Sequence, residues 1–308
     1  MKETIGSHAL LIVKESYFEQ MLAANNQSQL AAITSRAPGL ELEAQSHAQH
    51  VETLSKVKLV LEQRGVTYEL ANSRDLELVA KFARADFVVA IGGDGTFLMA
   101  SHFIKDGTRI LGVNSAPITS FGHFCICDSI SFASVLDKIT KGDLKPIELL
   151  RLEVSIDGKF LPKLALNEFL IAHKEPAASS RYRLNAKGQS EKHVCSGLLV
   201  ATPSGSTGFL RSEGGSVLAI DEQKFAFLER APFLRLGEQH QLRAGLLPRG
   251  EALEIVSEME GGMVYIDNNH AKYPFDRGAR LVVRAAQANL SAYVDPLCHS
   301  PYMNSTKP

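Results

Sequence analysis

Residues 87–96 are Phe87-Val88-Val89-Ala90-Ile91-Gly92-Gly93-Asp94-Gly95-Thr96. The apolar run from Phe87 to Ile91 is typical of a strand buried on both faces of a parallel sheet. Apolar residues with helical spacing follow from Phe97, so the glycine-rich segment joins a strand to a helix. This places the segment at the carboxyl end of the predicted sheet, where open α/β folds bind their ligands.

Phosphate is the ligand that this loop favours. Gly93 and Gly95 let backbone amides approach an anion without interference from a Cβ atom, and the following helix N-terminus adds partial positive charge. Asp94 is out of place beside phosphate unless a cation or a proton transfer is involved, which makes it a Mg²⁺ partner or a general base. The structural alternative is that Asp94 only caps the helix in an Asp-Gly turn.

Two other kinds of glycine-rich loop do not fit the sequence. A dinucleotide fingerprint Gly-x-Gly-x-x-Gly that starts at Gly93 requires a third glycine where Leu98 stands. A P-loop requires Gly-Lys followed by Ser or Thr, and this tripeptide does not occur in the chain. Dehydrogenases and P-loop enzymes are therefore disfavoured.

The chain around the loop predicts two domains. Up to residue 146, short apolar runs such as Ala9–Val13 alternate with helical periodicity, which predicts an α/β domain whose parallel sheet is covered on both faces. The polar stretch Asn25–Gln49 contains Pro38-Gly39 and predicts a loop or a loosely held helix. Residues 147–285 contain short strand-like runs separated by turn signals, which predicts a mostly-β domain.

Composition limits the class of function. The net charge of −1 gives no electrostatic reason to expect nucleic acid or an anionic membrane as partner, and no apolar run approaches the ~18 residues of a spanning helix. The N-terminus lacks the apolar core of a secretory signal, so we expect a cytoplasmic protein. Cys125-x-Cys127 lacks zinc-site spacing, so the four cysteines are interpreted as reduced thiols and no metal ligands are predicted.

Further motifs distinguish among kinases. The pentapeptide Gly92–Thr96 is shared by NAD kinases and by diacylglycerol and sphingosine kinases, so alone it indicates only a kinase. Leu166-Asn167-Glu168 and Thr202–Phe209, the latter followed by Arg211–Gly215, resemble motifs of the NAD kinase family in order and spacing. Gly112-Val113-Asn114 is similar to the family's Gly-Ile-Asn step, and the resemblance spans about residues 10–294.

The resemblance implies a fold and a reaction. It implies the NAD kinase and diacylglycerol kinase type of fold, with an α/β N-terminal domain that residues 286–308 help to complete and a mostly-β C-terminal domain. It also implies transfer of phosphate from ATP, with Mg²⁺ or another divalent cation, to the 2′-hydroxyl of the adenosine ribose of NAD, giving NADP and ADP. A homodimer or homotetramer is implied by analogy.

The resemblance also implies roles for single residues. Asp94 would be catalytic, as a base or by orienting the 2′-hydroxyl for in-line attack. Asn167 and Glu168 would hold the riboses and adenine, because amide and carboxylate groups suit ribose hydroxyls. The full set of substrate-binding residues implied is Gly93, Gly95, Thr96, Phe124, Asn167, Glu168, Ser196, Thr202, Ser204, Thr207, Gly208, Phe209 and Ser212.

The chain departs from the family pattern in ways that bear on the substrate. Ser196-Gly197 stands where the family has Asp-Gly, whose aspartate reaches NAD across a subunit boundary, and Phe209 replaces a tyrosine. The loop Ser115–His123 is longer than usual and resembles a divergent branch that includes mitochondrial-type NAD kinases. Two alternatives stay open: a lipid kinase with the same glycine loop, and a non-catalytic sensor of NAD(P) suggested by Ser196 and Phe209.

Overall fold

The computed structural model describes residues 7–72, 75, 77–105, 107–237 and 239–303. Backbone contacts divide these residues into two compact units. Unit 1 contains the described residues up to Ile147 together with Leu290–Asp295, and unit 2 contains Glu148–Asn289 with the described residues from Pro296 onward. Within the range 286–308, which the resemblance implies as completing the N-terminal domain, Leu290–Asp295 belong to unit 1.

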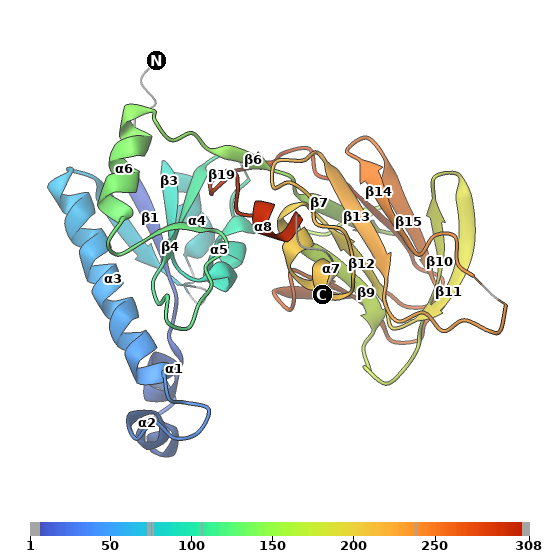
Figure 1. Ribbon diagram of the computed structural model, residues 1–308, viewed down its shortest axis with the longest axis horizontal. Coiled ribbons are helices and arrows are strands. Elements are labelled where there is room, and N and C mark those ends of the chain that lie inside the picture. The colour runs from blue at the N-terminus through green and yellow to red at the C-terminus, as the bar shows by residue number, and fades with distance from the viewer. Residues whose placement is uncertain (1–6, 73–74, 76, 106, 238, 304–308) are drawn as a thin grey trace. The chain divides into compact units, whose positions relative to one another are not determined.

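Unit 1 is an α/β unit with a largely parallel sheet (Figure 1). The strands follow the order β2-β1-β3-β4-β19-β6, and β5 pairs with β4. Pairings of β1 with β2 and β3, and of β4 with β3, β5 and β19, are parallel, as predicted. Its elements are β1 His8–Val13, α1 Tyr17–Ala23, α2 Gln27–Thr34, α3 Glu43–Gln63, β2 Thr67–Ala71, α4 Leu78–Arg84, β3 Phe87–Gly92, α5 Asp94–Ser101, β4 Arg109–Asn114, β5 Cys125–Asp128, α6 Phe132–Lys141, β19 Leu290–Tyr293 and, at its boundary, β6 Ile147–Leu149.

The central strands of this sheet are buried on both faces. Every residue of β3 is buried, and alternate residues such as Val89 and Ile91 join α3 and α6 in one core cluster. Val88 and Ala90 point to the opposite face, and α5 contacts β3 from outside that cluster. The predicted sheet with two covered faces is therefore confirmed.

The polar stretch Asn25–Gln49 is more regular than the sequence predicts. It contains all of α2 and the first part of α3, which starts at Glu43. Asn26 caps α2 by accepting the amide of Gln29, and Ser46 is buried although it is polar. The apolar periodicity is weak in the first part of α3 because polar side chains such as Ser46 are buried there, whereas Val57 and Leu61 supply apolar contacts farther along the helix.

Unit 2 is built of two six-stranded sheets whose described pairings are antiparallel. One has the order β11-β10-β15-β18-β7-β8 and the other β14-β13-β12-β9-β16-β17. A single apolar core draws residues from both, for example Leu253 and Phe227, so the mostly-β prediction is confirmed. The elements are β7 Leu152–Ile156, β8 Lys159–Phe160, β9 Glu168–His173, β10 Ser180–Ala186, β11 Gln189–Cys195, β12 Leu198–Ala201, the 3-10 helix η1 Ser204–Thr207, α7 Phe209–Ser212, β13 Lys224–Glu229, β14 Ala244–Pro248, β15 Ala252–Ser257, β16 Gly262–Ile266, β17 Ala271–Pro274, β18 Arg280–Ala285 and α8 Ser300–Met303.

Two expectations from the sequence concern membrane-spanning segments and the cysteines. None of the helices in the described ranges combines the length and the apolar character needed to cross a membrane. All four cysteines carry free thiols, and Cys125 and Cys127 lie in β5. Burial raises the pKa of the Cys127 thiol to about 12, so this side chain is a packed, protonated thiol.

Candidate functional site

The loop after β3 places Asp94 at the start of a helix. Asp94 is the first residue of α5, so the helix begins three residues earlier than Phe97, from which the sequence pattern predicts it. Its carboxylate Oδ1 accepts a hydrogen bond of 2.8 Å from the backbone amide of Phe124. This is the one hydrogen bond of the Asp94 side chain to the described residues, so Oδ2 is available to a ligand.

The glycines of the loop keep space for close backbone packing. A Cβ atom on Gly92 would collide with the side chain of Thr96, and one on Gly93 would collide with the hydroxyl of Ser120. Gly95 is exposed, and a Cβ there would meet nothing within 4 Å. The first helical turn, where backbone amides lack intrahelical partners, is therefore open at Gly95 and suits an anion.

The longer loop after β4 is fixed to α3 by polar contacts. His50 Nδ1 lies 2.8 Å from the Ser115 hydroxyl, and Ser46 Oγ lies 2.8 Å from Thr119 Oγ1. Asn114 Nδ2 donates to the carbonyl of Ser120 at 3.0 Å. Burial lowers the pKa of His50, which keeps this imidazole neutral at physiological pH. The loop therefore presents Ser120 to Gly93 from a fixed position.

Two residues next to the loop were missed by sequence reasoning. Lys14 follows β1, its amide donates to Ile91, and its Cβ lies 3.1 Å from where a Gly92 Cβ would stand. Burial lowers the pKa of the His123 imidazole below its usual value, and the negative charge of Asp94 opposes this shift. In a parallel sheet the strands β1 and β3 end at the same edge, so the residue that follows β1, Lys14, is expected beside the loop that follows β3.

Phe124, which the resemblance implies as a substrate-binding residue, lies in the core. The residue is 2% exposed, and its ring stacks on that of Phe97 with ring centroids 4.9 Å apart. Its contact with the loop is made by the backbone amide that binds Asp94. In this structure Phe124 therefore orients the aspartate.

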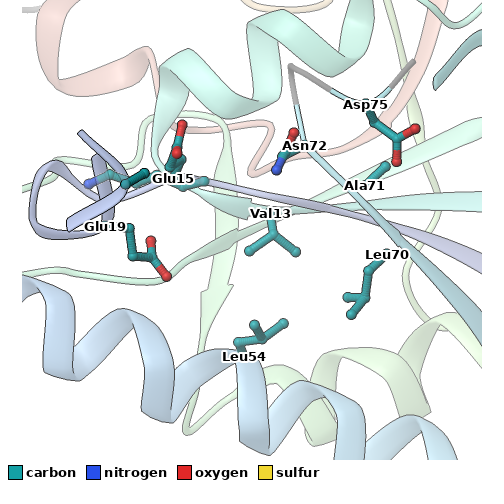
Figure 2. A pocket seen from close by; sticks show the side chains of 10 residues that line it. Val13, Glu15, Glu19, Leu54, Leu70, Ala71, Asn72 and Asp75 are labelled. Atoms are coloured by element: carbon teal, nitrogen blue, oxygen red, sulfur yellow. The ribbon is translucent and has the colours of Figure 1, made fainter. Parts of the chain in front are cut away.

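A cavity of about 460 Å³ opens where β1 and β2 end (Figure 2). Val13, Leu54 and Leu70 form its apolar side, from β1, α3 and β2. Lys14 and Glu19 are among the charged residues that line it. Because β1 is also the neighbour of β3, this cavity lies at the same edge of the sheet as the phosphate loop.

In unit 2 the predicted pair Asn167 and Glu168 is held by a buried aspartate. Asp267 is fully buried, and its carboxylate accepts the amides of Leu166, Asn167 and Glu168 at 2.8–3.1 Å. Its own φ is +45°, a conformation in which an Asp is better tolerated than most residues. Asp267 lies about a hundred positions after this pair in the sequence, and sequence reasoning missed its positioning role.

Glu168 has a strongly perturbed acidity. Its side chain is buried, and burial together with the charge of Asp267 raises the pKa of Glu168 to about 7, although the amide of Asn268 opposes this by donating to Oε1. Perturbed carboxyl groups of this kind are concentrated at functional sites. Glu168 can therefore exchange between a proton donor and an ionised acceptor near neutral pH.

The Thr-Pro segment packs directly on this pair. The Thr202 amide donates to Asn167 O at 2.8 Å, and a Cβ on Gly205 would collide with the Asn167 carbonyl. Two buried polar atoms here make no hydrogen bond to the described residues: Asn167 Oδ1 and Ser204 Oγ. Buried polar atoms are nearly always paired in native proteins, so these two are available to hydrogen-bond a bound molecule.

Of the remaining predicted residues, Ser196 lies at the other end of β12, and Phe209 is linked to this end through the side chain of Arg230. Ser196 is exposed, its amide donates to Arg230 O, and the guanidinium of Arg230 lies 4.6 Å from the ring centroid of Phe209. The exposed Ser212 donates its hydroxyl to Phe209 O. Thr207 and Gly208 lie between Ser204 and Phe209, at the turn where η1 meets α7.

Unit 2 therefore groups Asn167, Glu168, Thr202 and Ser204 together and holds Ser196 apart from them. Four strand residues separate Ser196-Gly197 from Thr202, a span of ~15 Å or more at roughly 3.3 Å per residue. Sequence reasoning missed Arg230, which carries charge to this end of β12 and pairs with Glu213 at 2.9 Å.

Two family models match nearly the whole chain. Residues 11–144 match the ATP-NAD kinase N-terminal domain, and residues 145–293 match the ATP-NAD kinase C-terminal domain. The two matches meet at residues 144/145, just before β6, and the chain passes from unit 1 to unit 2 within β6.

Individual proteins show the same similarity. A probable NADH kinase of Oryza sativa subsp. japonica is 33% identical over 255 residues, covering 76% of this chain and 78% of the relative. The crystal structure of an NAD kinase from Archaeoglobus fulgidus in complex with ATP has a TM-score of 0.69 at 22% identity and covers 96% of each chain. Yeast NADH kinase complexed with NADH has a TM-score of 0.67 at 14% identity, covering 97% of this chain and 89% of the other. These two structures share the fold.

Proposed function

Because the chain belongs to the ATP-NAD kinase family, we propose that it transfers the γ-phosphoryl group of ATP to the 2′-hydroxyl of the adenosine ribose of NAD. The products are NADP and ADP. The donor is proposed to bind with Mg²⁺ or another divalent cation as the MgATP complex, so that the cation arrives with the substrate phosphates. The observation that carries the proposal is Asp94, a carboxylate with one anchored oxygen and one available oxygen in a phosphate loop.

Asp94 is proposed to act on the attacking hydroxyl. The Phe124 amide fixes Oδ1, which leaves Oδ2 to accept the proton of the 2′-hydroxyl or to orient that hydroxyl for in-line attack. The amides at Gly93 and Gly95 lie at the start of α5, where developing negative charge on phosphate is stabilised, and Thr96 closes this turn by donating its amide to Gly93 O at 3.0 Å. Positioning and charge neutralisation then account for most of the catalysis.

The donor nucleotide is proposed to use the cavity at the ends of β1 and β2. Its volume of about 460 Å³ falls within the range of small-molecule sites, and its apolar wall of Val13, Leu54 and Leu70 suits a base. Lys14 stands between this cavity and Gly92, where its ammonium group would attract the phosphates.

Unit 2 is proposed to recognise the acceptor. Asn167 and Ser204 offer their unpaired oxygens, Glu168 accepts ribose hydroxyls when ionised, and Thr202 and Gly205 keep the pair in place. Phe209 supplies an aromatic face, flanked by Thr207, Gly208 and Ser212. Ribose hydroxyls would form hydrogen bonds with Asn167 Oδ1 and Ser204 Oγ, two buried atoms that are costly to leave unpaired.

Ser196 bears on the choice between NAD and NADH. It is exposed and distant from Asn167 along β12, so we propose that it acts on the substrate of a second copy in a homodimer or homotetramer, as the family aspartate does. Serine brings no charge, so it cannot attract the cationic nicotinamide of oxidised NAD. We therefore propose that NADH is accepted at least as well as NAD.

Turnover with a matched pair of variants tests the proposal. Purified protein is mixed with ATP, Mg²⁺ and either NAD or NADH, and the 2′-phosphorylated product is measured by separation of the nucleotides. We expect Asp94→Asn to lose roughly 10²-fold or more in kcat while it keeps its circular dichroism spectrum. Asp137→Asn, which removes an exposed carboxylate on α6 paired with Arg64, is the control and should keep its activity.

Two results would change the conclusion. Unchanged turnover in Asp94→Asn would remove Asp94 from the mechanism. Tight NADP binding with no turnover in the unaltered protein would favour the sensor alternative instead. The lipid-kinase alternative finds no support, because both halves of the chain match NAD kinase domains.

A further inference from the structure

Unit 2 contains a buried cluster of two histidines and one glutamate that the proposed reaction does not use. Glu229 lies between the two rings: His193 Nδ1 is 2.8 Å from Oε1, and His240 Nδ1 is 3.0 Å from Oε1 and 2.9 Å from Oε2. The side chains of Glu229 and His193 are fully buried, and that of His240 is 5% exposed. Three ligand atoms therefore converge within 4.8 Å of one another.

Three separate segments bring these side chains together. His193 lies in β11, Glu229 is the last residue of β13, and His240 lies in the connection to β14. The Glu229 amide donates to Arg243 O at 2.7 Å, which closes that connection back onto β13. Because rigid sheet elements supply two of the three groups, the cluster is preorganised.

A fourth group, Glu191, supports His193 from outside the cluster. Its Oε2 lies 3.4 Å from His193 Nε2, and its carboxylate accepts the amides of Gln241 and Leu242 next to His240. His193 Nε2 itself makes no aligned hydrogen bond within the described residues. A histidine whose far nitrogen faces a carboxylate is the arrangement that commonly orients metal-binding imidazoles.

Either a bound cation or a second proton on His193, which would let both ring nitrogens donate, satisfies this arrangement. If both Nδ1 atoms donate protons to Glu229, a neutral His193 presents an unprotonated Nε2 to the Glu191 carboxylate, which is repulsive. If a cation binds Nδ1, the proton moves to Nε2 and can point at Glu191. A divalent ion also balances the charge of Glu229, which is fully buried and costly to leave uncompensated, and part of the charge of Glu191, whose side chain is 21% exposed.

We propose that His193, Glu229 and His240 bind a transition-metal ion, with Zn²⁺ as the best fit. Two imidazoles and one carboxylate are a common ligand set for Zn²⁺, whereas Mg²⁺ prefers oxygen ligands alone. The site is therefore chemically distinct from the MgATP of the reaction. Bound there, the ion ties β11 and the connection before β14 to the end of β13.

The surroundings of His240 provide a route to the ion. A cavity of about 450 Å³ is lined by His240, Val194 and Phe233, and also by the basic residues Arg181 and Lys192. A water molecule or an anion from this side would complete the tetrahedral set that three protein ligands leave open.

Metal content of the full-length, tag-free protein tests the proposal. After incubation with ZnSO4 and dialysis, we expect inductively coupled plasma mass spectrometry to find one equivalent of zinc per protein chain. Co²⁺ in its place should give the visible absorption bands of a tetrahedral nitrogen and oxygen site. His240→Gln keeps a hydrogen-bond donor toward Glu229 and sits at the edge of the core, so it should fold but lose this equivalent.

Further variants separate a metal site from a hydrogen-bonded cluster. His193→Gln should also lose the equivalent, and Glu191→Gln should weaken zinc affinity by about 10- to 100-fold without abolishing it. His173→Gln, in β9 of the same unit, is the control for adventitious binding and should keep the full equivalent. Zinc absent from the unaltered protein, or equal in His240→Gln and the unaltered protein, would overturn the proposal.

Discussion

Replacement of Glu168 by glutamine removes one buried negative charge and keeps the shape of the side chain. The remaining Oε1 can still accept the amide of Asn268, which donates to Glu168 at 3.2 Å. Burial and the nearby carboxylate of Asp267 raise the pKa of Glu168 from 4.5 to about 7. Glutamine has no such ionisation, so the variant isolates the cost of charging this position.

The size and sign of the effect follow from proton linkage. Between pH 4.5 and 7 the folded protein holds a proton on Glu168 that the unfolded chain has released, so stability falls as pH rises through this window. Each pKa unit corresponds to about 1.4 kcal/mol, so the total cost above pH 7 is about 3 kcal/mol. At ~2–4 °C per kcal/mol, this corresponds to a difference of about 6–12 °C in Tm.

Thermal unfolding of ligand-free protein at pH 5 and pH 8 measures this effect. We expect Glu168→Gln to unfold at nearly the same temperature as the unaltered protein at pH 5, and at a higher temperature at pH 8. Glu251→Gln changes an exposed carboxylate in the same unit and serves as the control. A Tm difference that is constant with pH, or one that grows toward pH 5, would refute the reasoning.

Three more substitutions test the proposed substrate sites. Ser196→Asp should lower the KM for NAD by about 2- to 5-fold and leave the KM for NADH unchanged, because an exposed ion pair with the cationic nicotinamide is worth up to ~1 kcal/mol. Equal effects on both KM values would contradict a charge effect. Gly205→Ala should push its Cβ into the Asn167 carbonyl and cost about 1–3 kcal/mol of stability. Its control is Gly250→Ala, where a Cβ meets nothing within 4 Å, and equal Tm values for the two would be inconsistent with the collision. Leu54→Trp should fill the cavity beside β1 and raise the KM for ATP at least several-fold, with the KM for NAD unchanged. Its control, Leu59→Trp on the exposed side of α3, should leave both the cavity and the KM for ATP unchanged.

The core of unit 1 was predictable because its strands carry their own signal. The unbroken apolar run of β3 requires a sheet covered on both faces, and the glycines that follow it require a strand end. α3 was only partly predictable because Ser46, His50 and Thr53 are buried polar residues on its inner side. They bind the loop after β4 through hydroxyl and imidazole groups, and an apolar periodicity cannot reveal this.

The acceptor site shows a different limit. Asn167 and Glu168 were identified by resemblance, but their perturbed environment depends on Asp267, which lies about a hundred positions later in the chain. The sequence around Asp267 does not reveal that its carboxylate is fully buried. Its capping of three amides arises from the pairing of β9 with β16, which only the fold supplies.

The histidine cluster shows why residue types alone did not predict a metal site. Alternation along β11 places Glu191 and His193 on the same face, since successive side chains of a strand point to opposite faces. Alternation does not predict that Glu229, the last residue of β13, lies next to His193. That proximity depends on how the two sheets of unit 2 pack. His240 adds a third contribution from an irregular segment with no period. The close pair Cys125-x-Cys127 consists of protonated thiols, of which Cys127 is buried, whereas the better ligand set is spread over three segments.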